Sequence, residues 1–128
     1  MKTFALLCVL TLMLPATARA ELRTRMANSG QTTRMVVARS WNLDCDINGG
    51  VVKVTAKPQH GKLTNHLIET TVPLNRSGPN NSCLGRPTKG FEVDYTSERG
   101  FHGTDSFSLE VTTGLGRTFS DNYTVLVR

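Results

Sequence analysis

The 128-residue chain lacks a second long apolar run, which limits the classes of protein to which it can belong. Only residues 4–14 are almost continuously apolar, and this run is shorter than the roughly 20 residues that a membrane-spanning helix needs. The sequence also has no G-x-S-x-G, H-E-x-x-H or phosphate-loop motif. The 108 residues after position 20 have room for one hydrophobic core. We therefore expect neither a membrane span, a coiled coil nor an enzyme.

Residues 1–20 have the pattern of an export signal. Lys2 precedes the apolar run, and the tripeptide A-R-A at 18–20 has the small-x-small form that signal peptidase recognises. A buried N-terminal helix or a membrane anchor would be the alternatives, but neither needs such an ending. We expect cleavage before Glu21 and a periplasmic or secreted protein. Because Lys2 and Arg19 leave with the segment, the formal net charge falls from +5 to +3.

Cysteine is scarce, and this makes its pairing simple. Cys8 lies in the expected signal, so Cys45 and Cys83 remain in a protein bound for an oxidising compartment. A metal pair or a reactive thiol would be the alternatives, but the two cysteines form no C-x-x-C cluster and no histidine is close to either in sequence. We expect one structural disulfide. A closed loop of ~38 residues would stabilise the fold by about 4 kcal/mol in the chain-entropy model.

Alternation of apolar and polar residues predicts an all-β fold, because successive side chains of a strand point to opposite faces. The clearest segments are residues 52–57, 91–95, 106–111 and 123–127, and the weaker ones are residues 34–41 and 67–72. Gly114-Leu115-Gly116 is typical of a hairpin turn. Six or seven short strands in about 100 residues indicate a two-sheet β-sandwich that a disulfide could clamp. We assign the domain to residues 32–128 and treat residues 21–31 as a flexible leader.

Two stretches of the sequence resemble a known family. Residues 91–111 read F-E-V-D-Y-T-S-E-R-G-F-H-G-T-D-S-F-S-L-E-V, and residues 52–63 read V-K-V-T-A-K-P-Q-H-G-K-L. They are similar to the G-F-x-G-T-D-S-F and P-x-H-G-x-L motifs of bacterial cadherin-like, immunoglobulin-like domains. The resemblance implies an immunoglobulin-like β-sandwich. It also implies that Asp105 lies in a turn, where it accepts hydrogen bonds from backbone N–H groups.

The chain departs from that family in three respects. One copy of the domain stands alone, whereas the family usually forms tandem arrays. The family's Y-T-P is Tyr95-Thr96-Ser97 here, and the chain between Leu63 and Phe91 is longer than the family needs. A bridging adhesin role is therefore not expected to transfer.

An acidic stretch matches the first half of a calcium loop. Asp44, Asp46 and Asn48 precede Gly49 in the pattern D-x-[DN]-x-[DN]-G, in which alternate side-chain oxygens surround the ion. Some cadherin-like relatives with a D-x-D-G stretch here bind calcium. The twelfth position is Thr55 rather than the bidentate Glu that the loop requires. The alternative is an acidic turn stabilised by its own backbone, so we expect no metal and no cofactor.

Histidine gives no strong site signal. His60, His66 and His102 could act as metal ligands or bases, but no pair has the i, i+4 spacing of a helical metal site. Asp105, next to Thr104 and Ser106, could suggest hydrolysis, but the family places it in a structural role. We expect no catalytic residue.

Residues 73–90 are the most unusual segment of the expected domain. They contain three prolines, three glycines and three cations, with no acid and no aromatic residue, so we expect a loop rather than a strand. Restraint by Cys83 would lower the entropy lost on binding. We therefore nominate Arg76, Arg86 and Lys89 as residues that contact an anionic partner; the alternative is a solvated insertion.

These features predict an exported, non-enzymatic binding or interaction module of the bacterial envelope or extracellular space. Its partner would be a protein or an anionic envelope polysaccharide. Nucleic acid is not expected, because no aromatic residue stands among the clustered cations to stack on bases. The alternative function is a small secreted inhibitor whose disulfide-tethered loop blocks the active site of a hydrolase.

Overall fold

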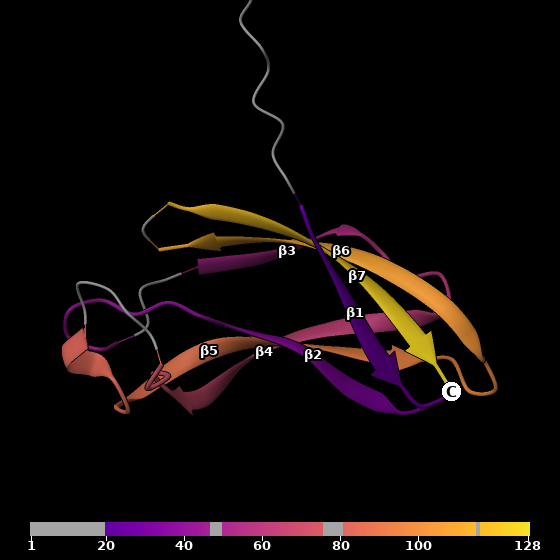
Figure 1. Cartoon of the computed structure of the whole chain (residues 1–128), viewed down its shortest axis with the longest axis horizontal. Helices are drawn as coiled ribbons and strands as arrows, with labels where there is room; N and C mark the ends of the chain where they lie inside the picture. The colour runs from indigo at the N-terminus through magenta and orange to yellow at the C-terminus, as the bar shows by residue number, and fades with distance from the viewer. Residues whose placement is uncertain (1–19, 47–49, 76–80, 115) are drawn as a thin grey trace, which may run out of the picture.

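A computed structural model of the chain shows two packed β-sheets (Figure 1). The structure describes residues 20–46, 50–75, 81–114 and 116–128, so the expected export signal lies outside the described residues. In chain order the elements are β1 (Glu21–Ala27), β2 (Thr32–Arg39), β3 (Gly50–Ala56), β4 (Gly61–Thr71), the short 3₁₀ helix η1 (Asn81–Cys83), β5 (Pro87–Ser97), β6 (Gly103–Thr113) and β7 (Thr118–Val127). The predicted all-β, two-sheet sandwich is confirmed. No helix among the described residues has both the length and the apolar character to cross a membrane.

The strands form a four-stranded and a three-stranded sheet. The first has the order β1-β7-β6-β3 and the second the order β2-β5-β4. The pairs β2–β5, β3–β6, β4–β5 and β6–β7 are antiparallel, whereas β1 runs parallel to β7. In β2 the register shifts between Arg34 and Val36, and Met35 at this bulge is buried in the core.

The prediction that residues 21–31 form a flexible leader outside the domain is wrong. Its first seven residues form β1, which pairs with β7 from Glu21↔Asp121 to Ala27↔Val127, so the domain includes residues that we had placed outside it. The alternation was hidden because arginines occupy positions on the same face as the buried Ala27. The partly buried guanidinium of Arg25 has a hydrogen-bond partner, because its Nε donates to the carbonyl oxygen of Met35 in β2. An edge strand tolerates such long cationic side chains, because their stems pack while their charged ends find partners.

Two strands are longer than the alternation predicted. β4 begins at Gly61 and pairs with the whole length of β5, from Gly61↔Ser97 to Thr71↔Pro87. The expectation that residues 73–90 hold no strand is therefore wrong at the C-terminal end, where residues 87–90 belong to β5. Pro87 is the first residue of β5. Proline is tolerated there because the N–H group that it lacks would donate only at the end of the hydrogen-bond ladder.

Two separate apolar clusters hold the protein together. The main core lies between the sheets, and its three largest aromatic residues stack in a row: the ring centroids of Tyr95 and Phe107 are 6.3 Å apart, and those of Phe107 and Tyr123 are 4.7 Å apart. The smaller cluster, which we call the disulfide cluster, consists of buried Cys45, Val72 and Cys83 with partly buried Trp41 and Leu84. The first cluster fixes the sandwich, and the second fixes the loops at one of its ends.

The predicted hairpin connects β6 and β7. The backbone N–H of Gly116 donates to the carbonyl oxygen of Thr113 at 2.9 Å, and that of Thr113 donates to the carbonyl oxygen of Arg117 at 2.8 Å. Gly116 has a φ of 76°, which glycine adopts without strain. Leu115, which we had placed at the centre of the turn, lies outside the described residues.

Candidate functional site

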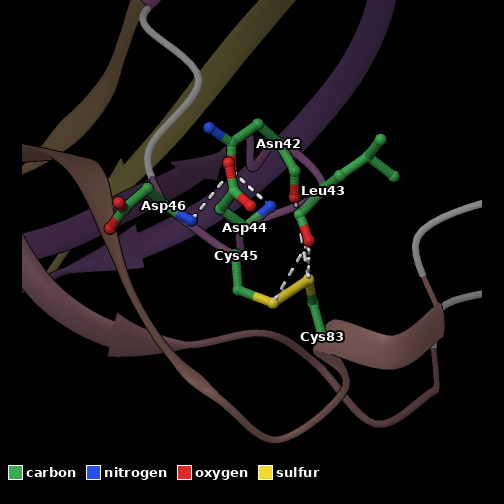
Figure 2. The surroundings of a disulfide bond; sticks show 6 residues. All are labelled: Asn42, Leu43, Asp44, Cys45, Asp46 and Cys83. Atoms are coloured by element: carbon green, nitrogen blue, oxygen red, sulfur yellow. Dashed lines mark hydrogen bonds between the residues drawn. A yellow bond between two sulfur atoms is a disulfide. The ribbon is translucent and has the colours of Figure 1, made fainter.

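The predicted disulfide between Cys45 and Cys83 is confirmed, and it joins the β2–β3 loop to η1 (Figure 2). The loop around Cys45 is organised by Asn42, whose Oδ1 accepts hydrogen bonds from the backbone N–H groups of Asp44 at 2.9 Å and Asp46 at 3.1 Å. Cys45 has a φ of 68°, an uncommon left-handed conformation for a residue other than glycine. Asn42 therefore shapes the turn that presents Cys45 to Cys83.

The calcium candidates do not form a described site. Asp44 and Asp46 are exposed, and they belong to no cluster of three metal-ligating His, Cys, Asp or Glu side chains within the described residues. Asn48 lies outside the described residues. Among the described residues of this loop, the side chain that bonds the backbone N–H groups is that of Asn42, which the motif comparison did not include.

The three nominated cations do not make a common surface among the described residues. Arg76 lies outside them, and Arg86 is exposed while its backbone bonds Cys83 and Val72. Lys89 lies in β5, where its Nζ is 3.8 Å from Oε1 of Glu69 on β4. A segment without an acid in the sequence thus has one beside it in space, because strand pairing brings Glu69 opposite Lys89.

The charges on and beside the two loops that the disulfide joins are balanced among the described residues. Three cations and three acids lie on or beside the loops that the disulfide joins: Arg39, Arg86 and Lys89, with Asp44, Asp46 and Glu69. No uniformly positive patch results from these six side chains. We call this part of the sandwich, with the disulfide cluster and its two loops, the disulfide end.

Two leucines on the disulfide end are unusually exposed. Leu43 next to Asn42 is 73% exposed and Leu74 in the segment after β4 is 78% exposed. The side chain of Leu43 extends away from the two sulfur atoms in Figure 2, while its carbonyl oxygen faces them. Gly85 lies beneath Leu74, since a Cβ placed on Gly85 would be 3.1 Å from Cδ2 of that leucine. Sequence reasoning missed both leucines, because the exposure of a side chain in an irregular loop follows no periodic pattern in the sequence.

The opposite end is built around a buried carboxylate, and we call it the Asp105 end. Asp105 in β6 accepts hydrogen bonds from the backbone N–H groups of Gln59 at 3.0 Å, His60 at 2.9 Å and Ser106 at 2.8 Å. Tyr95 donates a fourth from its hydroxyl at 2.9 Å. Burial alone would raise the pKa of Asp105, but these four donors hold it below the ordinary value of 3.8. The expected acceptor role is confirmed, although the residue lies in a strand rather than in a turn.

Tyr95 connects that carboxylate to the main core. Its side chain is fully buried, and burial together with the hydrogen bond to Asp105 raises the pKa of its hydroxyl. A Cβ on Gly61 would lie 2.4 Å from the tyrosine ring, so only glycine fits at the start of β4. The four donors to Asp105 and the close approach of Gly61 to Tyr95 make this group of residues part of the structural framework.

Two of the histidines lie at this end, in surface positions. The imidazole of His60 stacks on the ring of Phe101 with centroids 4.1 Å apart, and its Nδ1 is 3.7 Å from Oε2 of Glu98. His102 is exposed in the turn before β6. Neither has the two further ligands that a metal ion would need among the described side chains.

The third histidine lies in a group that sequence reasoning missed. His66 on β4, Glu92 on β5 and Asp94 on β5 each offer a ligand atom, and these atoms lie within 4.8 Å of one another. We had examined helical spacing only, whereas these residues meet through strand pairing, with His66 directly opposite Glu92. The useful signal would have been E-x-D on a strand with a histidine on its neighbour.

Comparisons with models of protein families, with curated proteins and with solved structures found no match to this chain.

Proposed function

We propose that this protein is an exported, non-enzymatic binding module of immunoglobulin-like, cadherin-like type, whose disulfide end contacts a protein in the periplasm or outside the cell. Support for the domain type comes from the strand order. The sheet β2-β5-β4 and the neighbours β7-β6-β3 have the order of the B-E-D and G-F-C strands of an immunoglobulin constant domain. The position of the disulfide differs, because here it links two loops rather than the two sheets.

The observation that carries the proposal is the exposure of Leu43 and Leu74 on loops that the disulfide restrains. Apolar side chains in water are tolerated singly, but two on linked loops at one end of a domain favour a contact surface. The covalent link lowers the conformational entropy that binding would otherwise remove from these loops. Trp41, Val72 and Leu84 support the same loops from within.

Charge favours a protein over an anionic polysaccharide as the partner. A polysaccharide surface would be held by an excess of cations, and its binding would weaken strongly with salt. The described charges on and beside the two linked loops balance, and Lys89 faces Glu69. Balanced charges around exposed leucines are typical of the polar rim and apolar centre of a protein interface.

The experiment is a capture from periplasmic and surface extracts with the immobilised protein. Leu43→Asp combined with Leu74→Asp should reduce the amount of captured partner at least tenfold. Leu22→Asp is the matched control, because Leu22 is 71% exposed but lies on β1, and it should leave capture unchanged. Equal loss in both variants would contradict a contact at the disulfide end.

A second arm addresses the polysaccharide and the inhibitor. Replacement of Arg76, Arg86 and Lys89 by Ser should change capture less than twofold at low salt. If the unaltered protein captures a polysaccharide and the triple variant does not, the proposal of a protein partner would be contradicted. If the captured protein is a hydrolase, an activity assay with the purified pair will show whether the module inhibits it.

A further inference from the structure

A cluster of ligand atoms lies on the outer face of the three-stranded sheet, away from both ends. Val93 and Tyr95 of β5 point into the core, so Glu92 and Asp94, which alternate with them, lie on the opposite face. β4 places His66 across from Glu92, and Thr64 across from Asp94. All three potential ligands belong to regular strands, and their backbone is fixed by ladder hydrogen bonds.

The separation of the ligand atoms fits a small cation. Nε2 of His66 is 3.4 Å from Oε1 of Glu92. Two donors bound at about 2.1 Å to a tetrahedral ion are themselves about 3.4 Å apart. The remaining donor, a carboxylate oxygen of Asp94, lies within 4.8 Å of the other two.

The low exposure of Glu92 is unusual for a charged residue of a protein surface. Its side chain is only 8% exposed, although it lies on the outer face of a sheet and carries a charge. One carboxylate oxygen, Oε2, is in an ion pair with Nε of Arg34 on β2 but accepts no hydrogen bond with proper geometry. Buried carboxylates normally accept hydrogen bonds, because desolvation of the charge is costly. The other oxygen, Oε1, faces His66, so Glu92 remains incompletely partnered.

Arg34 can act as the partner that orients the ligand. Its ion pair with Oε2 leaves Oε1 to face His66, and outer partners of a ligand carboxylate can orient it toward a metal in this way. The two carboxylates outnumber this single arginine, so the cluster keeps a net negative charge when His66 is neutral. The Arg34–Glu92 ion pair accounts for one carboxylate oxygen, while strand pairing places His66 and Asp94 near the other.

We propose that His66, Glu92 and Asp94 bind one divalent transition-metal ion, with Zn²⁺ as the representative ion. An imidazole with two carboxylates suits such an ion, whereas Ca²⁺ takes oxygen ligands alone. The three protein ligands leave a coordination position for water or for a group of another molecule. The site is independent of the proposed contact at the disulfide end.

Calorimetric titration of the purified, tag-free protein with Zn²⁺ tests the site. One ion should bind per chain, and His66→Gln should raise the Kd at least tenfold. His102→Gln and Glu98→Gln are matched controls, because these exposed residues lie at the Asp105 end, and both should leave the Kd unchanged. Equal affinity in His66→Gln and the unaltered protein, or no saturable binding up to millimolar Zn²⁺, would overturn the proposal.

A second variant and a spectroscopic readout separate binding from folding. Asp94→Asn removes a ligand at a less buried position than Glu92, and it should also raise the Kd at least tenfold while the melting temperature without metal stays within about 2 °C. In ¹⁵N NMR, Zn²⁺ should shift the imidazole signals of His66 and leave those of His60 and His102 in place. A shift of all three histidines would show surface binding only and would overturn the assigned site.

Discussion

At one end of the sandwich a buried carboxylate holds the β3–β4 loop against β5 and β6, whereas at the other end a disulfide holds the β2–β3 loop against η1. Asp105 accepts four short hydrogen bonds, and the main aromatic core packs next to them. Among the described residues, the disulfide is supported by one further buried residue, Val72, and by the partly buried Trp41 and Leu84. The ends therefore reach order by different means, one by many directional contacts and the other by a single covalent bond.

The difference explains why the ends are suited to different tasks. Both carboxylate oxygens of Asp105 and the hydroxyl of Tyr95 are used in holding the fold, and Gly61 leaves no space for a change of side chain. At the disulfide end the covalent bond fixes the backbone, which leaves Leu43, Leu74 and Arg86 pointing into solvent. A covalent restraint needs few side chains, and the remaining ones are free for contact.

The largest effect on stability is expected from Asp105→Ala. This change leaves three backbone N–H groups and the Tyr95 hydroxyl without their acceptor, and hydrogen bonds to a charged group contribute about 1.5–3 kcal/mol each. Because some donors near the loop will regain water, we expect a loss of about 5 kcal/mol in urea unfolding. The matched control Asp44→Ala removes an exposed acid of the other end and should cost below about 0.5 kcal/mol. Similar values for both would remove the distinction between the ends.

Cys83→Ser should follow, with a loss of about 4 kcal/mol and a fall of the melting temperature of well over ~10 °C. The unfolded, unreduced protein should show no reactive thiol from Cys45 or Cys83. Dithiothreitol should lower the melting temperature of the unaltered protein but not that of the variant. Two free thiols per chain before reduction would disprove the pairing in solution.

Tyr95→Phe removes one of the four donors to Asp105 and keeps the ring in the core. We expect a loss of about 2 kcal/mol, because the carboxylate loses one hydrogen bond and keeps three. Chemical denaturation at pH 7 measures it. A loss above about 4 kcal/mol would mean that the hydroxyl, rather than the backbone donors, dominates the Asp105 end.

Acid should weaken the two ends unequally. The pKa of Asp105 is lowered on folding, so its contribution is complete above the ordinary value of 3.8 and is lost as the pH falls below it through the folded value. Asp105→Asn should therefore flatten the fall in stability below about pH 4 relative to the unaltered protein. Cys83→Ser should shift the whole curve without changing its shape in that range. Identical curve shapes for Asp105→Asn and the unaltered protein would contradict the assigned pKa direction.

Lys89→Ala should have the smallest effect. Its ion pair with Glu69 is 3.8 Å long and both side chains are exposed, so we expect a change below about 0.5 kcal/mol. Thermal unfolding at low and high salt measures it. A larger loss would show that charge contributes to the order of the disulfide end.

The sequence predicted what alternation and composition determine. The sandwich, the disulfide and the strands around Val93, Leu109 and Val125 follow from period-two patterns and from a single possible cysteine pairing. It failed where a strand carries charge toward the core, as Arg23 and Arg25 of β1 do. An edge strand needs less apolar surface than a central one, and its alternation is correspondingly weak.

The candidate sites were harder to predict because they depend on register. Lys89 meets Glu69, and His66 meets Glu92, only through the pairing of β4 with β5. A shift of one residue would send each of these side chains to the other face. The separation of two residues along the sequence does not reveal such pairs. It also does not reveal the exposure of Leu43 and Leu74 in irregular loops.

The parallel pairing of β1 with β7 has a consequence for how the chain folds. Glu21 pairs with Asp121, so β1 finds its neighbour only when the chain has been made through β7. Contacts between such distant segments require closure of a long loop before they return any stabilisation, which slows folding. Until β7 has been made, the backbone N–H and C=O groups of β1 have no neighbouring strand to pair with, and such an unpaired strand is open to pairing with other chains.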